Sequence, residues 1–247
     1  MSGRFRWLSG YCRAVSGSPY AFRRFATTVR AGLAQARDLG DQLMERRYGI
    51  RSRGEVILPE HREDSSRLDY KPTPWATLPR ALRRSEVGPE DVFVDFGAGK
   101  GRVVFLAARY PFRRVVGVEL SPELSAVARA NVRRNLARLR CRDVQIVTSD
   151  VLDFAIPDDL TVAFFFNPFR GEIFASVIER LMASVDRRPR RVRIVYRNPA
   201  EHEFLMATGR VRLVRRIRGM RPTAAWSRTN STNIYELSTA RPGGGRA

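Results

Sequence analysis

The feature that most constrains the fold is an apolar run that leads directly into a glycine-rich turn. Residues 92–96 read Val-Phe-Val-Asp-Phe, and Gly97, Gly99 and Gly101 follow within five residues. A run of this kind indicates a strand buried on both faces, as in a parallel sheet. Glycine permits positive φ angles and lets a ligand approach the backbone closely. The sequence therefore predicts a ligand-binding turn at the carboxyl end of a buried strand, followed by a helix.

Strand and helix patterns alternate after this turn. Strands are predicted at 92–95, 114–119, 144–148, 161–166 and 192–196, and helices at 101–109, 122–139 and 173–185. Ser121 is a plausible N-cap for the second helix, because Pro122 would occupy its first position. Two last strands, 210–217 and 233–237, have no long helix between them, which indicates an antiparallel edge hairpin. The expected fold is a doubly wound, Rossmann-like α/β domain with a seven-strand, mostly parallel sheet.

Three parts of the chain are expected. Residues 1–69 form a basic, helical N-terminal extension and linker, residues 70–240 the main domain, and residues 241–247 a Gly/Arg-rich flexible tail. Apolar residues between positions 22 and 43 recur at helical spacing, which favours a helix packed on the main domain. A helix on a membrane surface or nucleic acid, and a transit peptide, stay as alternatives. Residues 51–71 are either a linker or an ordered loop over the domain.

Charge and cysteine content limit the partners and the location. The formal net charge is +20, and only Lys71 and Lys100 of the 45 basic residues are lysines. Such a chain attracts anionic surfaces, whether nucleic acid, an anionic membrane face or an acidic protein. Cys12 and Cys141 are far apart and show no zinc-ligand spacing with the two histidines, so no metal is expected. No run reaches the ~20 apolar residues of a membrane span, and a cytoplasmic enzyme is the default expectation.

Acidic residues follow three successive predicted strands. Asp95 ends the first strand, Glu119 ends the second about 20 residues after the glycines, and Asp150 with Val151 follows the third. Glu119 can accept both hydroxyls of an adenosine ribose, and Asp150 can accept from the adenine amino group while Val151 packs on the ring. Asp95 would face the ammonium group of a methionine moiety. Together these positions predict a site for S-adenosylmethionine.

Two other glycine-loop sites fit less well. The dinucleotide pattern G-x-G-x-x-G requires a glycine at position 102, where this chain has Arg102. The phosphate-binding pattern G-x-x-x-x-G-K-[ST] is absent, because Lys100 is followed by Gly101. A dinucleotide site and a fold that has lost its cofactor remain the alternatives.

These motifs resemble those of the class I, seven-strand, S-adenosylmethionine-dependent methyltransferases, over about residues 70–237. The stretch from Asp91, with Gly-Lys-Gly-Arg-Val-Val after it, is also similar to the non-SET histone lysine methyltransferases, and Tyr70-Lys71-Pro72-Thr73 to the c-subunit lysine methyltransferases. That resemblance implies a loop over the methionine end of the cofactor, with Tyr70 and Thr73 as contacts. The expected cofactor-binding residues are Tyr70, Thr73, Asp95, Gly97, Ala98, Gly99, Gly101, Glu119, Asp150 and Val151.

The segment after the fourth predicted strand is the candidate methyl-transfer site. Asn167-Pro168-Phe169 resembles the Asn/Asp-Pro-Pro-aromatic motif of amino-group methyltransferases, with one proline missing. Methyl transfer needs a neutral nitrogen lone pair in line with the sulfonium methyl, and the Asn167 side-chain oxygen can orient an amine by accepting its hydrogen bonds. Phe166 and Phe169 can exclude water. No general base is assigned, and His202 is expected to be a surface histidine at a helix start rather than part of the substrate site.

The function that these observations favour is N-methylation of an amino group such as a protein lysine. Methylation of a nucleic-acid base or a small molecule is the alternative within the same class of enzyme. A non-catalytic, basic nucleic-acid-binding module on the same fold is the alternative from another class, and the intact acidic and glycine positions argue against it.

Overall fold

The computed structural model describes residue 35 and residues 38–58, 66–219 and 231–239. The chain divides into two compact units, Met1–Leu43 and Met44–Ala247. Most of the predicted helical stripe at positions 22–43, as well as Cys12, His61 and the tail at 241–247, lies outside the described residues, although residues 38–43 are helical. The following description concerns the second unit.

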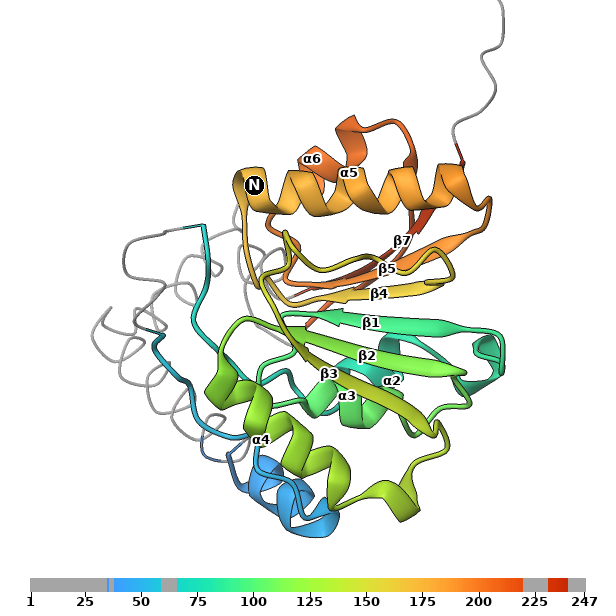
Figure 1. Cartoon of the computed structure of the whole chain (residues 1–247). Helices are drawn as coiled ribbons and strands as arrows, with labels where there is room; N and C mark the ends of the chain where they lie inside the picture. Colours follow the sequence, from blue (N-terminus) through green and yellow to red (C-terminus); the bar gives the residue numbers. More distant parts are fainter. Residues whose placement is uncertain (1–34, 36–37, 59–65, 220–230, 240–247) are drawn as a thin grey trace, which may run out of the picture. The chain divides into compact units, whose positions relative to one another are not determined.

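A seven-stranded sheet forms the centre of this unit, in the order β3-β2-β1-β4-β5-β7-β6 (Figure 1). The strands are β1 Val92–Phe96, β2 Arg114–Glu119, β3 Asp143–Thr148, β4 Val162–Phe165, β5 Val192–Arg197, β6 Val211–Ile217 and β7 Thr232–Leu237. The first five are parallel, and β7 is antiparallel to both β5 and β6. The predicted doubly wound sheet is confirmed. Because β7 lies between β5 and β6, only β6 of the predicted edge hairpin is at the edge.

Helices cover both faces of the sheet (Figure 1). They are α2 Thr77–Ala81, α3 Arg102–Ala107, α4 Pro122–Arg133, α5 Gly171–Arg187 and α6 His202–Ala207, with short 3-10 turns at Arg84–Glu86 and Leu136–Arg138. Figure 1 shows α5 and α6 on one face and α2, α3 and α4 on the other. None of the described helices is long and apolar enough to cross a bilayer.

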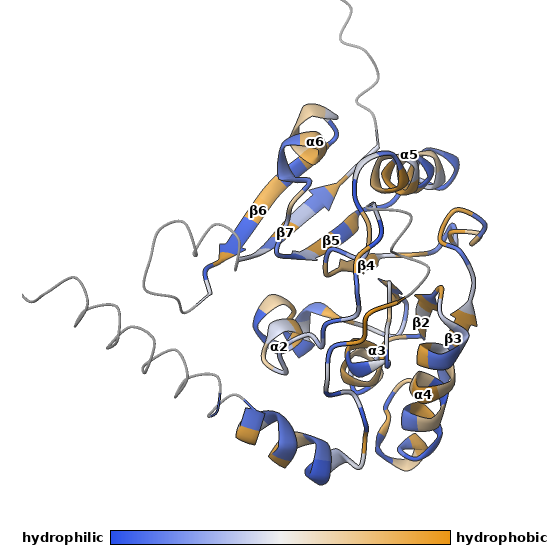
Figure 2. Ribbon diagram, turned by 90° about the vertical axis from the view of Figure 1, so that its left-hand side faces the viewer, coloured by the Kyte–Doolittle hydropathy of each residue, from blue (hydrophilic) through white to orange (hydrophobic). Residues whose placement is uncertain are grey.

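Side chains point alternately to the two faces of the sheet along each strand, and this produces two separate apolar cores. Phe93 of β1 packs in the core beneath α2 and α3, and its neighbour Val94 packs in the core beneath α5. Successive strand residues point to opposite faces, so a strand buried on both sides must be apolar throughout. In α5, Phe174, Val177 and Leu181 are fully buried at helical spacing, and Figure 2 shows both apolar and polar residues around this helix.

Helix α4 begins where the sequence predicted, but it ends earlier than predicted. The Ser121 hydroxyl accepts a hydrogen bond from Leu124 N at 3.2 Å and Pro122 opens the helix, as predicted. The helix was expected to continue to residue 139, but it ends at Arg133. Asn135 explains the early end, because its side-chain amide donates to the Asn131 carbonyl and competes with the helical hydrogen-bond pattern.

Gly117, in the middle of β2, allows α3 to lie close to the sheet. A Cβ atom at this position would stand 2.6 Å from Val104 Cγ2 and 2.9 Å from Ala98 Cβ. Both distances are shorter than carbon–carbon contact, and both neighbours belong to packed parts of the structure. The close approach of α3 to β2 therefore requires glycine at this position.

We expect Gly117→Ala to lower the free energy of unfolding by about 1–3 kcal/mol, because the added methyl overpacks the interface between α3 and β2. Urea unfolding followed by circular dichroism measures the change. The matched control is Gly88→Ala, where the nearest atom to a new Cβ is 3.9 Å away. Equal stability of the two variants would show that α3 is not held tightly against β2.

Candidate active site

A cleft lies at the carboxyl ends of β1, β2, β3 and β4, where the sequence places the candidate site. It brings together residues predicted to bind cofactor and residues predicted to face the acceptor. The predicted residues that line it are Tyr70, Thr73, Asp95, Gly97, Ala98, Glu119, Val151, Asn167, Pro168 and Phe169. Gly99, Gly101 and Asp150 are not part of the lining.

The glycine turn has a backbone conformation that requires glycine. Gly97, Gly99 and Gly101 have φ angles of +78°, +54° and +77°. The N–H groups of Gly97 and Ala98 both donate to the Val118 carbonyl at 2.9 Å, which ties the turn to β2. L-residues rarely adopt such φ angles, so side chains at these positions would strain the turn.

Each glycine is also closely covered by another segment. An added Cβ would stand 2.3 Å from Pro168 Cβ at Gly97, 2.2 Å from Tyr70 Cε2 at Gly99 and 2.8 Å from Ala128 Cβ at Gly101. Pro168 belongs to the loop after β4, and Tyr70 belongs to the segment before the sheet. The glycine turn therefore lies between these two segments, which form two walls of the cleft.

Glu119 is held in a fixed position by backbone N–H groups. Its Oε2 atom accepts from Gly99 N at 2.6 Å, and its Oε1 atom accepts from Ser121 N at 3.0 Å. The residue is buried and lines the cleft. These two bonds orient the Glu119 carboxylate at the edge of the cleft, and a carboxylate is the type of acceptor that ribose hydroxyls require.

Asp95 is a buried carboxyl group next to this turn. It is 3% exposed, and burial together with the nearby Glu119 charge raises its pKa well above the usual range. Burial of a carboxylate without a cationic partner is unfavourable. An ammonium group placed in the cleft would reverse part of this shift, and the amino-acid end of S-adenosylmethionine carries such a group. The two carboxyl groups on this side of the cleft, Asp95 and Glu119, therefore fit that cofactor.

Asp150 has a partner that the sequence did not indicate. Its Oδ2 atom lies 2.5 Å from Arg67 Nη2, and its Oδ1 atom accepts from Leu152 N at 2.9 Å. The neighbouring Ser149 and Val151 line the cleft, whereas Asp150 itself does not. Contact of Asp150 with an adenine amino group stays a prediction.

The loop after β4 forms the opposite wall. Asn167 has a φ angle of +44°, which asparagine tolerates better than most residues. Its Oδ1 atom accepts from Ala200 N at 3.4 Å, and the residue lines the cleft together with Phe166 and Phe169. Asn167 therefore stabilises the turn at the edge of the cleft, and contact of its amide group with an acceptor stays a prediction.

His202 begins α6, as expected for a histidine at a helix start. Its Nδ1 atom lies 2.8 Å from the Tyr235 hydroxyl, and it is not part of the cleft lining. The described residues contain no group of three metal-ligating side chains.

Residues 66–71 are a part of the site that the sequence patterns did not reveal. Leu68 N donates to the Pro168 carbonyl at 3.1 Å, and Arg170 N donates to the Ser66 carbonyl at 2.7 Å. This segment therefore pairs with the loop after β4, as a short strand would. The lining residues that were not predicted include Leu58, Arg67, Leu68, Asp69, Lys71 and Leu120. The sequence predicted an ordered loop over the domain as one alternative for residues 51–71, and the family resemblance pointed to Tyr70 and Thr73, but neither indicated the pairing with the loop after β4.

Residues 93–188 match the sequence model of a methyltransferase domain, and the order of the seven strands is consistent with the Rossmann-like methyltransferase fold. These residues form a methyltransferase domain of the S-adenosylmethionine-dependent type. A protein-lysine N-methyltransferase from Saccharolobus islandicus (strain REY15A) is 35% identical over 69 residues, which are 28% of this chain and 43% of that protein. The chain thus matches less than half the length of this curated relative.

Solved structures share the fold at low sequence identity. A putative RNA methyltransferase from Pyrococcus horikoshii superposes with a TM-score of 0.50 at 16% identity, covering 72% of this chain and 91% of that one. An RNA methyltransferase from Salinibacter ruber in complex with S-adenosyl-L-homocysteine has a TM-score of 0.47 at 22% identity, covering 71% and 98%. At these identities the likeness concerns the fold and not the substrate.

We expect Asp95→Asn to stabilise the protein without ligand and to weaken cofactor binding. Because the folded-state pKa of Asp95 is raised, its favourable contribution to stability is present at low pH and is lost as the pH rises through that pKa. The stability of the variant relative to the natural protein should therefore increase as the pH rises above the unfolded-state pKa of about 3.9. Thermal unfolding at a series of pH values from about 4 upward, with and without S-adenosylhomocysteine, measures both effects.

Asp158→Asn is the matched control, since Asp158 is an exposed partner of Arg187 and lies outside the cleft. Parallel stability curves for the natural protein and Asp95→Asn would contradict the unfavourable burial of this carboxyl group.

Proposed function

We propose that this protein is an S-adenosylmethionine-dependent N-methyltransferase whose acceptor is an amino group, with a protein lysine as the favoured substrate. The observation that carries the proposal is the convergence of Asp95, Glu119 and Asn167 on one cleft around a positive-φ glycine turn. The two carboxyl groups suit the cofactor side, and the amide suits the acceptor side.

On the cofactor side, each residue has a role that its environment supports. Glu119, oriented by two backbone N–H groups, accepts from the ribose hydroxyls, and buried Asp95 pairs with the ammonium group. Val151 and Leu120 present apolar surface in the same cleft and suit the adenine ring. Tyr70 and Thr73, on the covering segment, suit the methionine end. When bound, S-adenosylmethionine supplies an electrophilic methyl group on a sulfonium.

On the acceptor side, Asn167 and the aromatic rings position an amine. An amide oxygen that accepts an N–H bond from the substrate leaves the nitrogen lone pair directed toward the methyl group, and this is mainly an effect of orientation. Phe166 and Phe169 exclude water from this side of the cleft. The incoming amine must be neutral, since an ammonium has no lone pair to donate.

A protein lysine is favoured over other amines because of one relative. The protein from Saccharolobus islandicus that is 35% identical over 69 residues is a protein-lysine N-methyltransferase. The net charge of +20 supports a second candidate, a nucleic-acid substrate, because arginine binds phosphate groups well. The acceptor experiment below distinguishes the two.

Substitutions at Asn167 test the acceptor side. We expect Asn167→Ala to reduce kcat by about 10²-fold or more while cofactor affinity stays nearly unchanged, because the amide acts on orientation. Asn167→Gly is the matched control, since glycine adopts the positive φ without strain but lacks the amide. If Asn167→Gly retains full turnover, the asparagine serves only the turn and has no part in transfer.

The acceptor is identified by transfer of labelled methyl groups into fractionated host lysate, followed by the pH dependence of the reaction. We expect label in protein and a kcat/KM that rises about tenfold per pH unit below the lysine pKa of ~10.4, since only the neutral amine reacts. Label in RNA or DNA, with a rate that is flat near neutral pH, would replace lysine with a nucleic-acid base as the substrate.

A further inference from the structure

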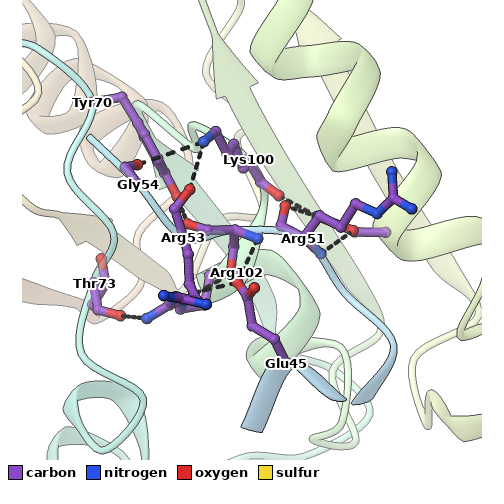
Figure 3. Close-up of polar contacts among 10 residues, drawn as sticks. Glu45, Arg51, Arg53, Gly54, Tyr70, Thr73, Lys100 and Arg102 are labelled. Carbon is purple, nitrogen blue, oxygen red and sulfur yellow. Dashed lines mark hydrogen bonds and ion pairs between the residues drawn. The ribbon is translucent and has the colours of Figure 1, made fainter. Parts of the chain in front are cut away.

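A buried arginine connects the glycine turn to the segment that precedes the sheet (Figure 3). Arg102, the first residue of α3, is 2% exposed. Its Nε atom donates to Ser52 Oγ at 2.8 Å, and its Nη1 atom donates to the Thr73 carbonyl at 2.9 Å. Its guanidinium carbon lies 4.7 Å from the centre of the Trp75 ring. One side chain thus contacts two segments that are far from it in sequence.

Glu45 completes this network from the preceding helical segment. Its Oε1 atom accepts from Ser52 N at 2.6 Å and from Ser52 Oγ at 2.8 Å, and it lies 3.5 Å from Arg102 Nη2. Ser52 is completely buried. The charge of Arg102 is therefore compensated within the unit that contains the sheet, and the position of Ser52 is fixed by both charged groups.

A second set of contacts holds the main chain of the same segment. Lys100 Nζ donates to the Arg53 carbonyl at 2.7 Å. Asn131, buried on α4, donates to the Arg51 carbonyl and to the Lys100 carbonyl at 2.9 Å each, and accepts from Arg51 N at 2.8 Å. Residues 51–53 are thus bound to the glycine turn from both sides of Gly101.

The segment in turn positions the covering wall of the cleft. The Tyr70 hydroxyl donates to the Ser52 carbonyl at 2.6 Å, and the Tyr70 ring occupies the space next to Gly99. Thr73, whose carbonyl accepts from Arg102, also lines the cleft. Displacement of the Arg102 side chain would therefore release both Tyr70 and Thr73.

Stability alone does not account for an arginine at this position. A guanidinium is always charged, and well-packed apolar residues often stabilise a buried site as well as an ion pair does. What the guanidinium adds is direction, because its separate N–H groups determine where the Ser52 and Thr73 oxygens lie.

We propose that Arg102 is a positioning residue for the cofactor: it holds residues 51–53 and Thr73 so that Tyr70 and Thr73 form the wall against which the cofactor binds. This inference rests on the proposed function. It predicts that Arg102 controls cofactor affinity, and that residues 51–53 become more ordered when the cofactor binds.

The test is calorimetric titration with S-adenosylhomocysteine of the natural protein, Arg102→Met and Arg102→Lys. We expect Kd to rise at least about tenfold in Arg102→Met, since two charge-assisted hydrogen bonds are lost. Arg102→Lys should show a smaller rise, because it keeps the charge but cannot reach both acceptors. Arg187→Met, at an exposed ion pair on α5, is the control and should bind like the natural protein.

Two further measurements separate positioning from a general loss of structure. In Arg102→Met, the KM for S-adenosylmethionine should rise while kcat at saturating cofactor stays within about twofold. Amide hydrogen exchange at residues 51–53 should slow when S-adenosylhomocysteine is added to the natural protein, and should not respond in the variant. Lowered thermal stability with unchanged Kd would overturn the proposal.

If Arg102→Met does not fold, Ser52→Ala and Glu45→Gln remove the partners instead, and unchanged Kd in both would overturn the proposal. Failure of the natural protein itself to bind S-adenosylhomocysteine would overturn the proposed function, and this inference with it. Binding by the natural protein with equal Kd in all variants would overturn only the role of Arg102.

Discussion

The hydrogen bonds that the Glu119 carboxylate accepts from Gly99 N and Ser121 N connect three parts of the site. Gly99 belongs to the turn after β1, Glu119 ends β2, and Ser121 caps α4. A single buried carboxylate thus joins two adjacent strand ends and the start of a helix. The turn can be rich in glycine and still be well ordered, because these bonds offset the conformational freedom of its residues.

The same part of the molecule contains an unfavourable group. Asp95 is buried near Glu119, and the loss of solvation and the Glu119 charge both raise its pKa. A sheet selected for stability alone would have an apolar residue here, as at the other four positions of β1. Groups that are unfavourable in the protein alone and suitable for a ligand are characteristic of binding sites. The unfavourable burial of the Asp95 carboxyl group is consistent with a site for a cationic ligand.

The part of the cleft that faces the strand ends is formed by segments before the sheet, which do not belong to the alternation of strands and helices. Residues 66–68 pair with the loop after β4, and residues 51–53 are bound by Lys100, Asn131 and, through Ser52, Arg102. These contacts give the segment before the sheet a direct relation to the glycine turn. In physical terms the site consists of a rigid half, built on parallel strands, and a covering half held by polar contacts.

The sequence by itself determined the parallel core, the glycine turn and the acidic strand ends, because burial on both faces, positive φ and strand-end position each require particular residue types. It could not show that β7 lies between β5 and β6, that α4 ends at Arg133, or that Asp150 pairs with Arg67. In the sequence, Arg102 broke a dinucleotide pattern and belonged to the Gly-Lys-Gly-Arg-Val-Val stretch of the family resemblance, and neither observation indicated its contacts. Its role depends on contacts with residues about 30 to 60 positions away. Such long-range polar contacts leave no periodic signal in a sequence, and only the tertiary structure decides them.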